Sequence, residues 1–406
     1  MGSRVVVTGL GVVAGLPCDI DRFAETLQRG VMPGSEVDQR AGYHVPGSAR
    51  LAVLSGGVDL SAWVSPSMGR RMSMPSKFAV AAARMALADT GLASGVEGPR
   101  TTVVMSSALG ATDFTERLLR TAILEGPEAV SPFTFTESVA NAAAAQIAIA
   151  SHAQGPNLTI VQREAGILTA VGRGAAEIAA GRADHALVGG VEEMPPLMHA
   201  LLDRLESLAR PGNAGGEVAR PFDRRRSGFV AAEGAVVLVL EREDRARARG
   251  AHIRARVRGF GSAFDPSAPR VGWGRGEATL AEALRRVLQS AGLAPRDVGR
   301  IVSGASGSVS GDRLEAHTLR RAWQGEPLPP VLAPKSVTGQ YGGGFLASAV
   351  LAASNQEFAA TAGFSEPDPE LGVIPHRGGP LPPADITLVT SLASGGAASW
   401  LLLERI

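Results

Sequence analysis

The residues GPNLTIVQREAG at positions 155–166 lead into the part of the chain where helix and strand alternate most plainly. Residues 168–180 have mostly small side chains, which predict a closely packed and buried helix. Residues 185–190 are largely apolar and predict a strand. This succession of a helix and a strand indicates a layered α/β architecture.

The same alternation continues toward both ends of the chain. In the first part, we expect strands at residues 4–13, 101–107 and 234–241, and a helix at 74–92. The rhythm then begins again, with strands expected at 253–260, 298–303, 386–391 and 398–403 and helices at 280–292 and 347–355.

Two stretches of similar rhythm predict an internally duplicated fold. We assign residues 1–245 to an N-terminal half and residues 246–406 to a C-terminal half, within the length expected for one large domain or two fused ones. The charged residues 242–249 are expected to form a solvated connection. The proline-rich stretches 327–334 and 375–383 are expected to be surface loops.

The composition indicates a soluble, enzyme-like scaffold. Hydrophobic residues make up 45% of the chain and aromatic residues only 4%, so the core must be built from Ala, Val, Leu and Ile. A formal net charge of +1 argues against nucleic acid or a membrane surface as a partner. No apolar run approaches the ~18 residues of a membrane span.

Cys18 is the one cysteine, which excludes an intramolecular disulfide and fits a cytoplasmic protein. Two interpretations of this residue stay open: an inert thiol in a turn after the first strand, or the end of a lipoprotein leader. Gly9 and Gly11 interrupt the apolar run and Pro17 precedes the thiol, which argues against a leader.

Four further motifs accompany residues 155–166 in a fixed order. They are VVVTGLGVV at 5–13, FDRRRSGFVAAEG at 222–234, DRLEA at 312–316 and PKSVTG at 334–339. In this order and at these separations they resemble the β-ketoacyl synthases of the thiolase-fold superfamily. The resemblance covers nearly the whole chain and implies a thiolase-like, internally duplicated fold with α-β-α-β-α layers.

The resemblance implies a cysteine and two histidines as reacting groups, and this chain has none of them. The cysteine position is Glu164, the first histidine position is Gly304, eight residues before Asp312, and the second is Gln340, directly after Gly339. A thioester requires a thiol, and the imidazoles would stabilise an oxyanion and move protons. We therefore expect no competent catalytic residue and no activity of the chain alone.

No other histidine replaces the missing ones. All seven histidines fall outside these positions: His44, His152, His185, His199, His252, His317 and His376. Three charged residues that surround the reacting groups in active relatives persist, namely Lys335, Glu315 and Asp312. We expect a structural ion pair between Lys335 and Glu315. Alternatively, Lys335 neutralises Glu164, since a buried glutamate without a cation has a raised pKa and stays protonated.

A condensing-enzyme scaffold without its reacting groups resembles the chain length factor, the ketosynthase β subunit of bacterial type II polyketide synthases. That subunit typically carries Gln at the cysteine position, whereas this chain carries Glu164. Gln162 lies two residues too early, given the spacing from Gly155-Pro156. Ser394 stands where active ketosynthases have a gating phenylalanine, so no acyl-gating step is expected.

The resemblance also implies partners. A catalytic ketosynthase α subunit would complete a heterodimer, and an acyl carrier protein would deliver malonyl units to a growing polyketide chain. Neither a cofactor nor a metal is expected in this chain, because the acyl groups would be carried on the phosphopantetheine of the carrier protein. The small and aromatic residues over 132–150 are expected at the dimer interface.

Three residues are implied as determinants of product length. The family carries them at positions i, i+3 and i+7 of the helix after a Ser-Ser strand end, which corresponds here to Ala111, Phe114 and Leu118 after Ser106-Ser107. That spacing places them on one helix face. A plain amphipathic core helix has the same spacing, so both interpretations stay open.

Two other functions also stay open. One is a self-sufficient condensing enzyme or malonyl decarboxylase that uses Glu164, which consumption of malonyl carrier protein by the purified chain would favour. The other is a non-enzymatic module that binds acyl groups or a carrier protein, which a stable homodimer indifferent to a ketosynthase would favour.

Overall fold

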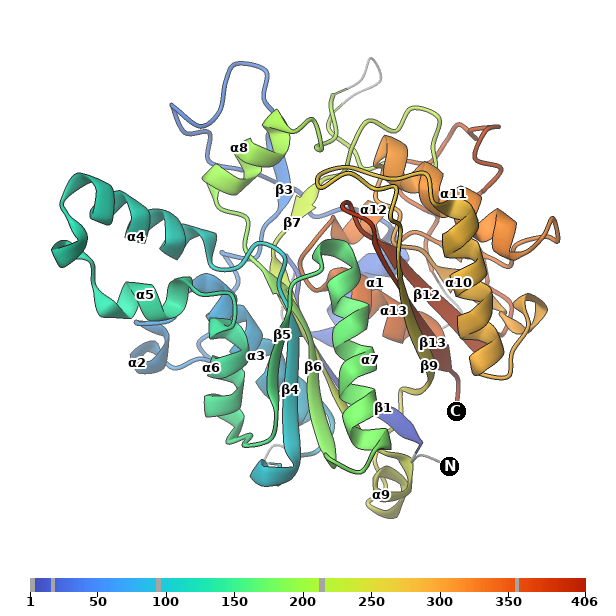
Figure 1. Ribbon diagram of the computed structural model, residues 1–406, viewed down its shortest axis with the longest axis horizontal. Helices are drawn as coiled ribbons and strands as arrows, with labels where there is room; N and C mark the ends of the chain where they lie inside the picture. Colours follow the sequence, from blue (N-terminus) through green and yellow to red (C-terminus); the bar gives the residue numbers. More distant parts are fainter. Residues whose placement is uncertain (1–3, 16–18, 93–95, 212–215, 355–357) are drawn as a thin grey trace.

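The computed structural model describes residues 4–15, 19–92, 96–211, 216–354 and 358–406. Cys18, and the last residue of the helix expected at 347–355, lie outside these ranges. Ten strands form one sheet in the order β11-β10-β12-β13-β9-β1-β8-β6-β4-β5 (Figure 1). Their bounds are β1 Val5–Val13, β4 Thr101–Ser106, β5 Asn157–Ile160, β6 His185–Glu192, β8 Gly234–Arg242, β9 Ala255–Phe264, β10 Arg300–Val302, β11 Val331–Leu332, β12 Ile386–Leu392 and β13 Ala397–Glu404.

The two halves of this sheet follow one plan. In the N-terminal half, β8 pairs antiparallel with both β1 and β6, and β6, β4 and β5 are parallel. In the C-terminal half, β13 pairs antiparallel with both β9 and β12, and β12, β10 and β11 are parallel. β1 and β9 join the halves by antiparallel pairing. The predicted internal duplication is therefore present in the strand topology.

Helices cover the outside of both halves and fill the space between them (Figure 1). The outer helices are α3 (Met74–Asp89) on the N-terminal half, and α10 (Glu277–Ser290) and α11 (Val309–Ala322) on the C-terminal half. The central helices α7 (Gly166–Ala179) and α13 (Gly344–Ser354) contact strands of both halves. This arrangement is the α-β-α-β-α layering expected from the resemblance.

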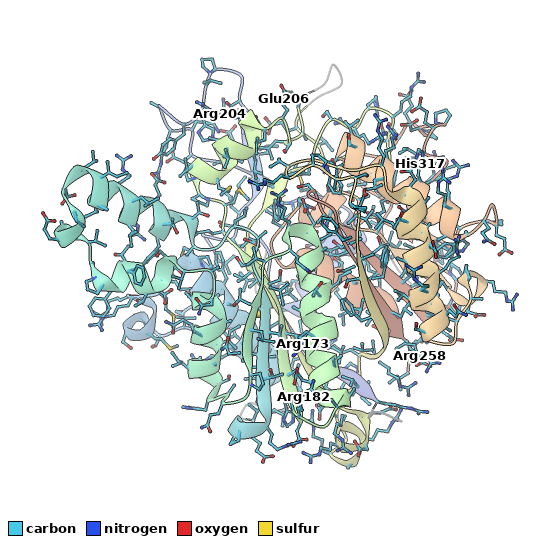
Figure 2. The ribbon with its side chains drawn as sticks, viewed as in Figure 1. Arg173, Arg182, Arg204, Glu206, Arg258 and His317 are labelled. Atoms are coloured by element: carbon cyan, nitrogen blue, oxygen red, sulfur yellow. The ribbon has the colours of Figure 1, made fainter. Side chains whose placement is uncertain are left out.

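Glycines allow α7 to lie between the two halves. A Cβ on Gly172 would be 2.2 Å from Cγ of Phe260 on β9, and a Cβ on Gly174 would be 2.3 Å from Cγ1 of Val188 on β6. Because these neighbours come from opposite halves, only a helix with such small residues fits in this position. The buried carboxylate of Glu177 forms local ion pairs with Arg173 on the same helix (2.9 Å) and with Arg182 just after its end (2.6 Å), and Figure 2 labels both arginines.

The remaining elements frame the site and one projecting lobe. A small three-stranded sheet contains β2 (Ser35–Glu36), β3 (Leu51–Val53) and β7 (Ala231–Ala232). Helices α4 (Thr112–Leu124) and α5 (Pro132–Ser138) project together from the N-terminal half (Figure 1). The other helices are α1 Ile20–Arg29, α2 Pro66–Gly69, α6 Ala142–Ser151, α8 Pro196–Arg204, α9 Glu243–Ala248 and α12 Lys335–Thr338. Among the described residues, no helix is both long and apolar enough to cross a membrane.

Two expectations about connections were wrong. Residues 242–249 are not simply solvated, because they contain α9, whose Glu243 is buried and forms ion pairs with Arg247 and Arg256 at 2.8 Å each. The stretch 327–334 is not only a surface loop either. It contains β11, which is buried and pairs with β10, so its apolar residues complete the edge of the sheet.

Candidate functional site

Glu164 lies in the short 3-10 turn Arg163–Ala165, between β5 and the start of α7. Arg163 has a φ of 47°, a left-handed conformation that non-glycine residues rarely adopt and that often marks a functional turn. The buried Glu164 carboxylate accepts a hydrogen bond from the Tyr341 hydroxyl at 3.4 Å and another from the Ser394 N–H at 3.2 Å. The turn is therefore held by contacts with distant parts of the chain.

Glu164, Lys335 and Gln340 line one small cavity at this turn. Its volume of about 40 Å³ has room for a water molecule but not for an acyl chain. Glu192 and Tyr341 form part of the same wall. No thiol and no imidazole occur among the described residues that line the cavity. This set of side chains can form a polar, hydrogen-bonded wall, but it has no group that forms a thioester.

The ion pair expected between Lys335 and Glu315 does not form. No carboxylate among the described residues lies within ion-pair distance of Lys335, and its Nζ instead lies 4.6 Å from the centroid of the Phe345 ring. Burial lowers the pKa of Lys335, whereas the charges of Glu164, Glu315 and Asp312 raise it. Burial in turn raises the pKa of Glu164, and the charge of Lys335 opposes that rise. Lys335 therefore acts at longer range, and Glu164 is its strongest electrostatic partner.

Glu315 lies behind the cavity and supports the neighbouring loop. Its Oε1 accepts hydrogen bonds from the Ser303 hydroxyl (2.5 Å), the Gly304 N–H (3.1 Å) and the Thr390 hydroxyl (3.0 Å). Its other oxygen has no hydrogen-bond donor among the described residues. Burial raises the pKa of Glu315 to about 7, although these donors and Lys335 oppose the shift. The carboxyl group can thus keep a proton on Oε2 without losing a contact.

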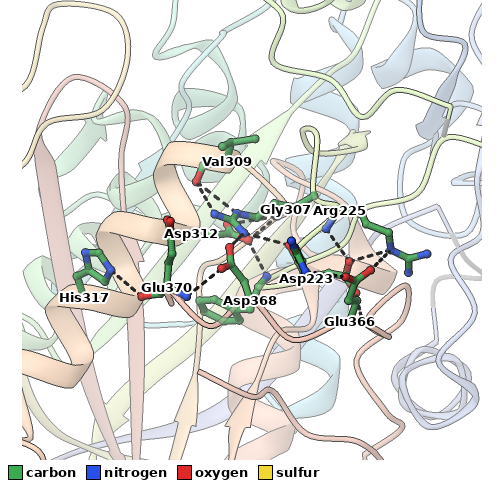
Figure 3. A network of polar contacts seen from close by, with 12 residues as sticks. Asp223, Arg225, Gly307, Val309, Asp312, His317, Glu366, Asp368 and Glu370 are labelled. Atoms are coloured by element: carbon green, nitrogen blue, oxygen red, sulfur yellow. Dashed lines mark hydrogen bonds and ion pairs between the residues drawn. The ribbon is translucent and has the colours of Figure 1, made fainter. Parts of the chain in front are cut away.

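Asp312 joins two of the sequence motifs. Its carboxylate accepts hydrogen bonds from the N–H groups of Phe222 (2.9 Å), Ser306 (3.0 Å) and Gly307 (3.1 Å). Burial raises its pKa to about 6. Figure 3 shows Asp312 beside Gly307, next to the polar contacts that Asp223 makes. Asp312 therefore has a structural role and does not enter the cavity.

The backbone explains why histidine is absent from one of the two expected positions. A Cβ on Gly304 would lie 2.7 Å from the carbonyl oxygen of Thr390, so a larger residue requires the strand to shift. Gln340 is different, because its buried side chain lines the cavity and its Oε1 has no partner in the described part of the chain. Its backbone bonds to Val230 and Ala232 at 2.8 and 2.7 Å.

Arg163 links the turn of Glu164 to the loops that contain Ser394 and Arg270. Its guanidinium donates hydrogen bonds to the Ser394 hydroxyl (2.6 Å), the Ser394 carbonyl (3.2 Å) and the Arg270 carbonyl (3.3 Å). Glu164 binds the same turn through the Ser394 N–H. We call these contacts of Arg163 and Glu164 with Ser394 and Arg270 the latch. It holds the turn at residues 393–396 against Glu164, and we expect it to restrict access to the cavity.

The latch predicts the reactivity of a thiol placed at position 164. In a Cys18→Ser background, Glu164→Cys should react slowly with iodoacetamide, and adding Arg163→Ala should accelerate alkylation about tenfold, because several hydrogen bonds worth ~1 kcal/mol each are lost. Alkylation rates measured by mass spectrometry test this. Arg258→Ala, which removes an exposed guanidinium that donates to the Ala291 carbonyl, is the matched control. Equal alkylation rates with and without Arg163 would show that the latch does not restrict access to position 164.

Glu315 predicts a pH dependence of stability. The folded carboxyl keeps its proton up to a pKa of about 7, whereas the unfolded one ionises near the reference value of 4.5, so folding is disfavoured progressively as the pH rises between these values. Glu315→Gln keeps the acceptor oxygen and removes the titration. We compare the free energy of unfolding of the variant with that of wild type. The variant's value minus the wild-type value should rise by about 2–3 kcal/mol between pH 5 and pH 8, because each pKa unit corresponds to about 1.4 kcal/mol.

Urea denaturation at several pH values measures this difference directly. Because both proteins share all other titrating groups, those contributions cancel. The exposed Glu282→Gln serves as the control and should show no such trend. A difference that stays constant with pH would show that Glu315 is ionised throughout in the folded chain.

The residues expected to set product length lie away from the cavity. Ala111 is the buried N-cap residue of α4, and Phe114 and Leu118 follow on the helix, half-buried. The guanidinium of Arg117 lies 4.1 Å from the centroid of the Phe114 ring. No residue of α4 is buried in this chain, so the helix is not an amphipathic core helix, which was the alternative interpretation of its spacing.

Sequence reasoning missed four residues at or next to this site: Arg163, Tyr341, Glu192 and Glu193. Arg163 and Tyr341 directly adjoin Glu164 and Gln340, and Tyr341 is one of only two tyrosines in the chain. Glu192 ends β6 and is followed by Glu193, an acidic pair after an apolar strand. Burial raises the pKa of Glu192 to about 8. Charged residues at the buried end of a strand were the signal that could have identified this pair.

Comparison with known proteins agrees with this geometry. The family described as "Beta-ketoacyl synthase, N-terminal domain" matches residues 2–246, and "Beta-ketoacyl synthase, C-terminal domain" matches residues 254–364. The chain is 31% identical to the tetracenomycin polyketide synthase ketoacyl synthase beta subunit of Streptomyces glaucescens, over 99% of this chain and 98% of that protein. It is 29% identical to 3-oxoacyl-[acyl-carrier-protein] synthase 2 of Vibrio cholerae, over 99% of both.

A solved structure, "The ishigamide ketosynthase/chain length factor", matches over 100% of both chains with a TM-score of 0.87 and 27% identity. The similarity thus extends over the full fold, with its duplicated sheet and its central helices. The family matches, the motif order and the architecture agree with one another. With its thiolase-like fold and two matching halves, the chain belongs to the β-ketoacyl synthase family.

Proposed function

We propose that this chain is a chain length factor, the ketosynthase β subunit of a type II polyketide synthase. It pairs with a catalytic ketosynthase α subunit, completes the tunnel that holds the growing polyketide, and sets the length at which extension stops. The partner supplies the cysteine and histidines. Neither a cofactor nor a metal belongs to this chain, because the acyl groups arrive on the phosphopantetheine of an acyl carrier protein.

The observation that carries the proposal is the altered reacting site. Glu164, Gly304 and Gln340 replace the reacting groups, and the cavity between Glu164 and Gln340 holds only about 40 Å³. An acyl chain has no room there, and no thiol is present to bind it. The framework around the site is nevertheless intact, since Glu315 and Asp312 keep their hydrogen bonds. A maintained scaffold without reacting groups supports a role beside a catalytic partner.

The projecting lobe supports the need for a partner. Five large apolar side chains of α4 and α5 are exposed by half or more: Leu119 (51%), Ile123 (78%), Leu124 (72%), Phe133 (56%) and Phe135 (59%). We call these five residues the α4–α5 surface. An apolar surface of this kind on a folded chain favours association with another protein. It overlaps residues 132–150, which were expected at the dimer interface, and carries the helix of Ala111, Phe114 and Leu118.

Two relatives support the assignment by their own descriptions. The Streptomyces glaucescens protein is a ketoacyl synthase beta subunit of a polyketide synthase, and the ishigamide structure is of a ketosynthase and chain length factor. Sequence identity alone does not separate this role from that of a catalytic synthase, since the Vibrio cholerae enzyme is similar to nearly the same degree. The side chains at positions 164, 304 and 340 are what support the chain length factor over a catalytic synthase.

Co-expression with a ketosynthase α subunit tests the proposal. The α subunit encoded nearest to this chain is the first choice, and the purified species is weighed by native mass spectrometry. We expect a one-to-one heterodimer that extends malonyl units on an acyl carrier protein only when both chains are present. A homodimer that consumes malonyl carrier protein alone would instead indicate an enzyme that uses Glu164. A homodimer that ignores the ketosynthase would indicate a non-enzymatic binding module.

A further inference from the structure

Helix α4 is attached to the rest of the chain mainly at its first turn. None of its residues is buried, and its helical neighbours are α5 and the 3-10 turn Pro127–Ala129. Its N-cap residue, Ala111, has no side chain that can accept a hydrogen bond from the first helical N–H groups. Such groups need acceptors from elsewhere. Contacts at this first turn therefore help to fix where α4 begins.

Two adjacent glutamates at the end of β6 supply those acceptors. Glu192 accepts hydrogen bonds from the N–H groups of Ala108 and Leu109, the latter at 3.0 Å, and from the Ser107 hydroxyl at 3.3 Å. Glu193 accepts the N–H of Asp113 through Oε1 at 2.7 Å. Asp113 is the second residue of α4, so Glu193 replaces the missing side-chain cap from a different element.

Both carboxyl groups are buried at a cost that their hydrogen bonds offset only in part. Their exposed fractions are 6% for Glu192 and 3% for Glu193. Burial raises the pKa of Glu193 to about 7, and the charges of Asp113 and Glu233 add to that rise. A buried carboxyl group with no cation beside it is unfavourable for stability alone. Its hydrogen bond to the Asp113 N–H ties this carboxyl group to the start of α4.

We propose that Glu193 is a specificity-determining positioning residue, which fixes α4 from inside the fold and thereby places Ala111, Phe114 and Leu118 along the polyketide tunnel. This role rests on the proposed function. Glu192 supports it by holding the loop that leads into the helix. Farther along α4, Tyr43 binds Glu116, and the Thr115 hydroxyl donates to the Ser138 carbonyl at 3.1 Å, so these contacts steady the middle of the helix but not its start.

Two measurements on Glu193→Ala, Glu193→Gln and wild type test the proposal. The first is hydrogen exchange over residues 110–116 of the chain alone. Loss of the cap in Glu193→Ala should speed exchange about fivefold, the factor that a lost helix cap typically produces. Glu193→Gln keeps the Oε1 acceptor and should stay near wild type. Glu125→Ala, at the exposed far end of α4, is the matched control and should leave this segment unchanged.

The second measurement is the distribution of product lengths made by the heterodimer of each variant with the ketosynthase α subunit. Glu193→Ala should shift product to other lengths, and Glu193→Gln should restore the wild-type distribution. A merely structural role would lower the yield and leave the ratio of lengths unchanged. If Glu193→Ala does not fold, Glu193→Asp withdraws the carboxylate from Asp113 with a smaller change and should act in the same direction.

If hydrogen exchange is unchanged in Glu193→Ala, Glu193 does not cap α4. If exchange is faster but the ratio of product lengths is unchanged, Glu193 does not determine specificity. Failure of the proposed function has a different result, since the wild-type heterodimer would then make no polyketide. That outcome would remove the specificity role as well, while the exchange measurement on the chain alone would still report on the cap.

Discussion

Ile123→Asp should prevent this chain from pairing with its ketosynthase and so abolish polyketide formation. Ile123 is the most exposed side chain of the α4–α5 surface, with 78% of its surface accessible, and it makes no contribution to the core of the chain. A carboxylate there costs the free chain almost nothing. In an interface it would be desolvated without a partner, so affinity should fall by about 100-fold if Ile123 lies near the centre of the contact.

Titration of the variant against the ketosynthase α subunit, followed by native mass spectrometry, measures this effect. The matched control is Ile374→Asp, at a residue of the C-terminal half whose exposed fraction is 59%. The control should pair as the wild type does. If Ile123→Asp also pairs normally and supports product formation, the α4–α5 surface is not the contact with the partner, and the expected role of α4 in the tunnel loses its basis.

Ala111→Phe should shorten the polyketide by at least one malonyl-derived unit. Ala111 is buried before the first turn of α4, with an exposed fraction of 4%, and its side chain is a single methyl group. A benzyl group at this place would shorten the space in the proposed tunnel. The growing polyketide would then have to displace a packed aromatic ring to complete its last extension steps. The distribution of product lengths, measured by liquid chromatography and mass spectrometry, gives the result.

Two companion variants keep this experiment decisive. Ala129→Phe makes the same substitution at an exposed position and should leave product length unchanged. Ala111→Leu adds less volume and should have a smaller effect, which allows the test to proceed if the phenylalanine disturbs the first turn of α4. A heterodimer that assembles with Ala111→Phe and still makes full-length product would show that Ala111 does not line the tunnel.

Local patterns were enough to predict most of the regular structure. The strand expected at 4–13 is β1 (Val5–Val13), and the helix expected at 168–180 is α7 (Gly166–Ala179). Apolar runs and the spacing of small residues predict these elements, and both patterns lie within short stretches of the sequence. The helix α4 was placed only through the resemblance. Ala111, Phe114 and Leu118 have the same spacing as the apolar residues of a core helix, and no local pattern tells a surface for a partner from a surface for the core.

The composition of the reacting site also followed from local spacing, because motif order assigns Glu164, Gly304 and Gln340 to their positions. The tertiary structure alone decided how those residues are used. Lys335 lies over Phe345 and not beside Glu315, Arg163 binds Ser394 from 231 residues away, and Glu193 caps α4 through Asp113, 80 residues before it. Such contacts depend on strand register and on the packing of α7 between two half-sheets. Motif order and local patterns identified the family and the duplicated order of elements, and they placed Glu164, Gly304 and Gln340 at the positions of the reacting groups. The cavity, the latch and the cap were decided by the fold, because each joins residues whose distance in space no local pattern encodes.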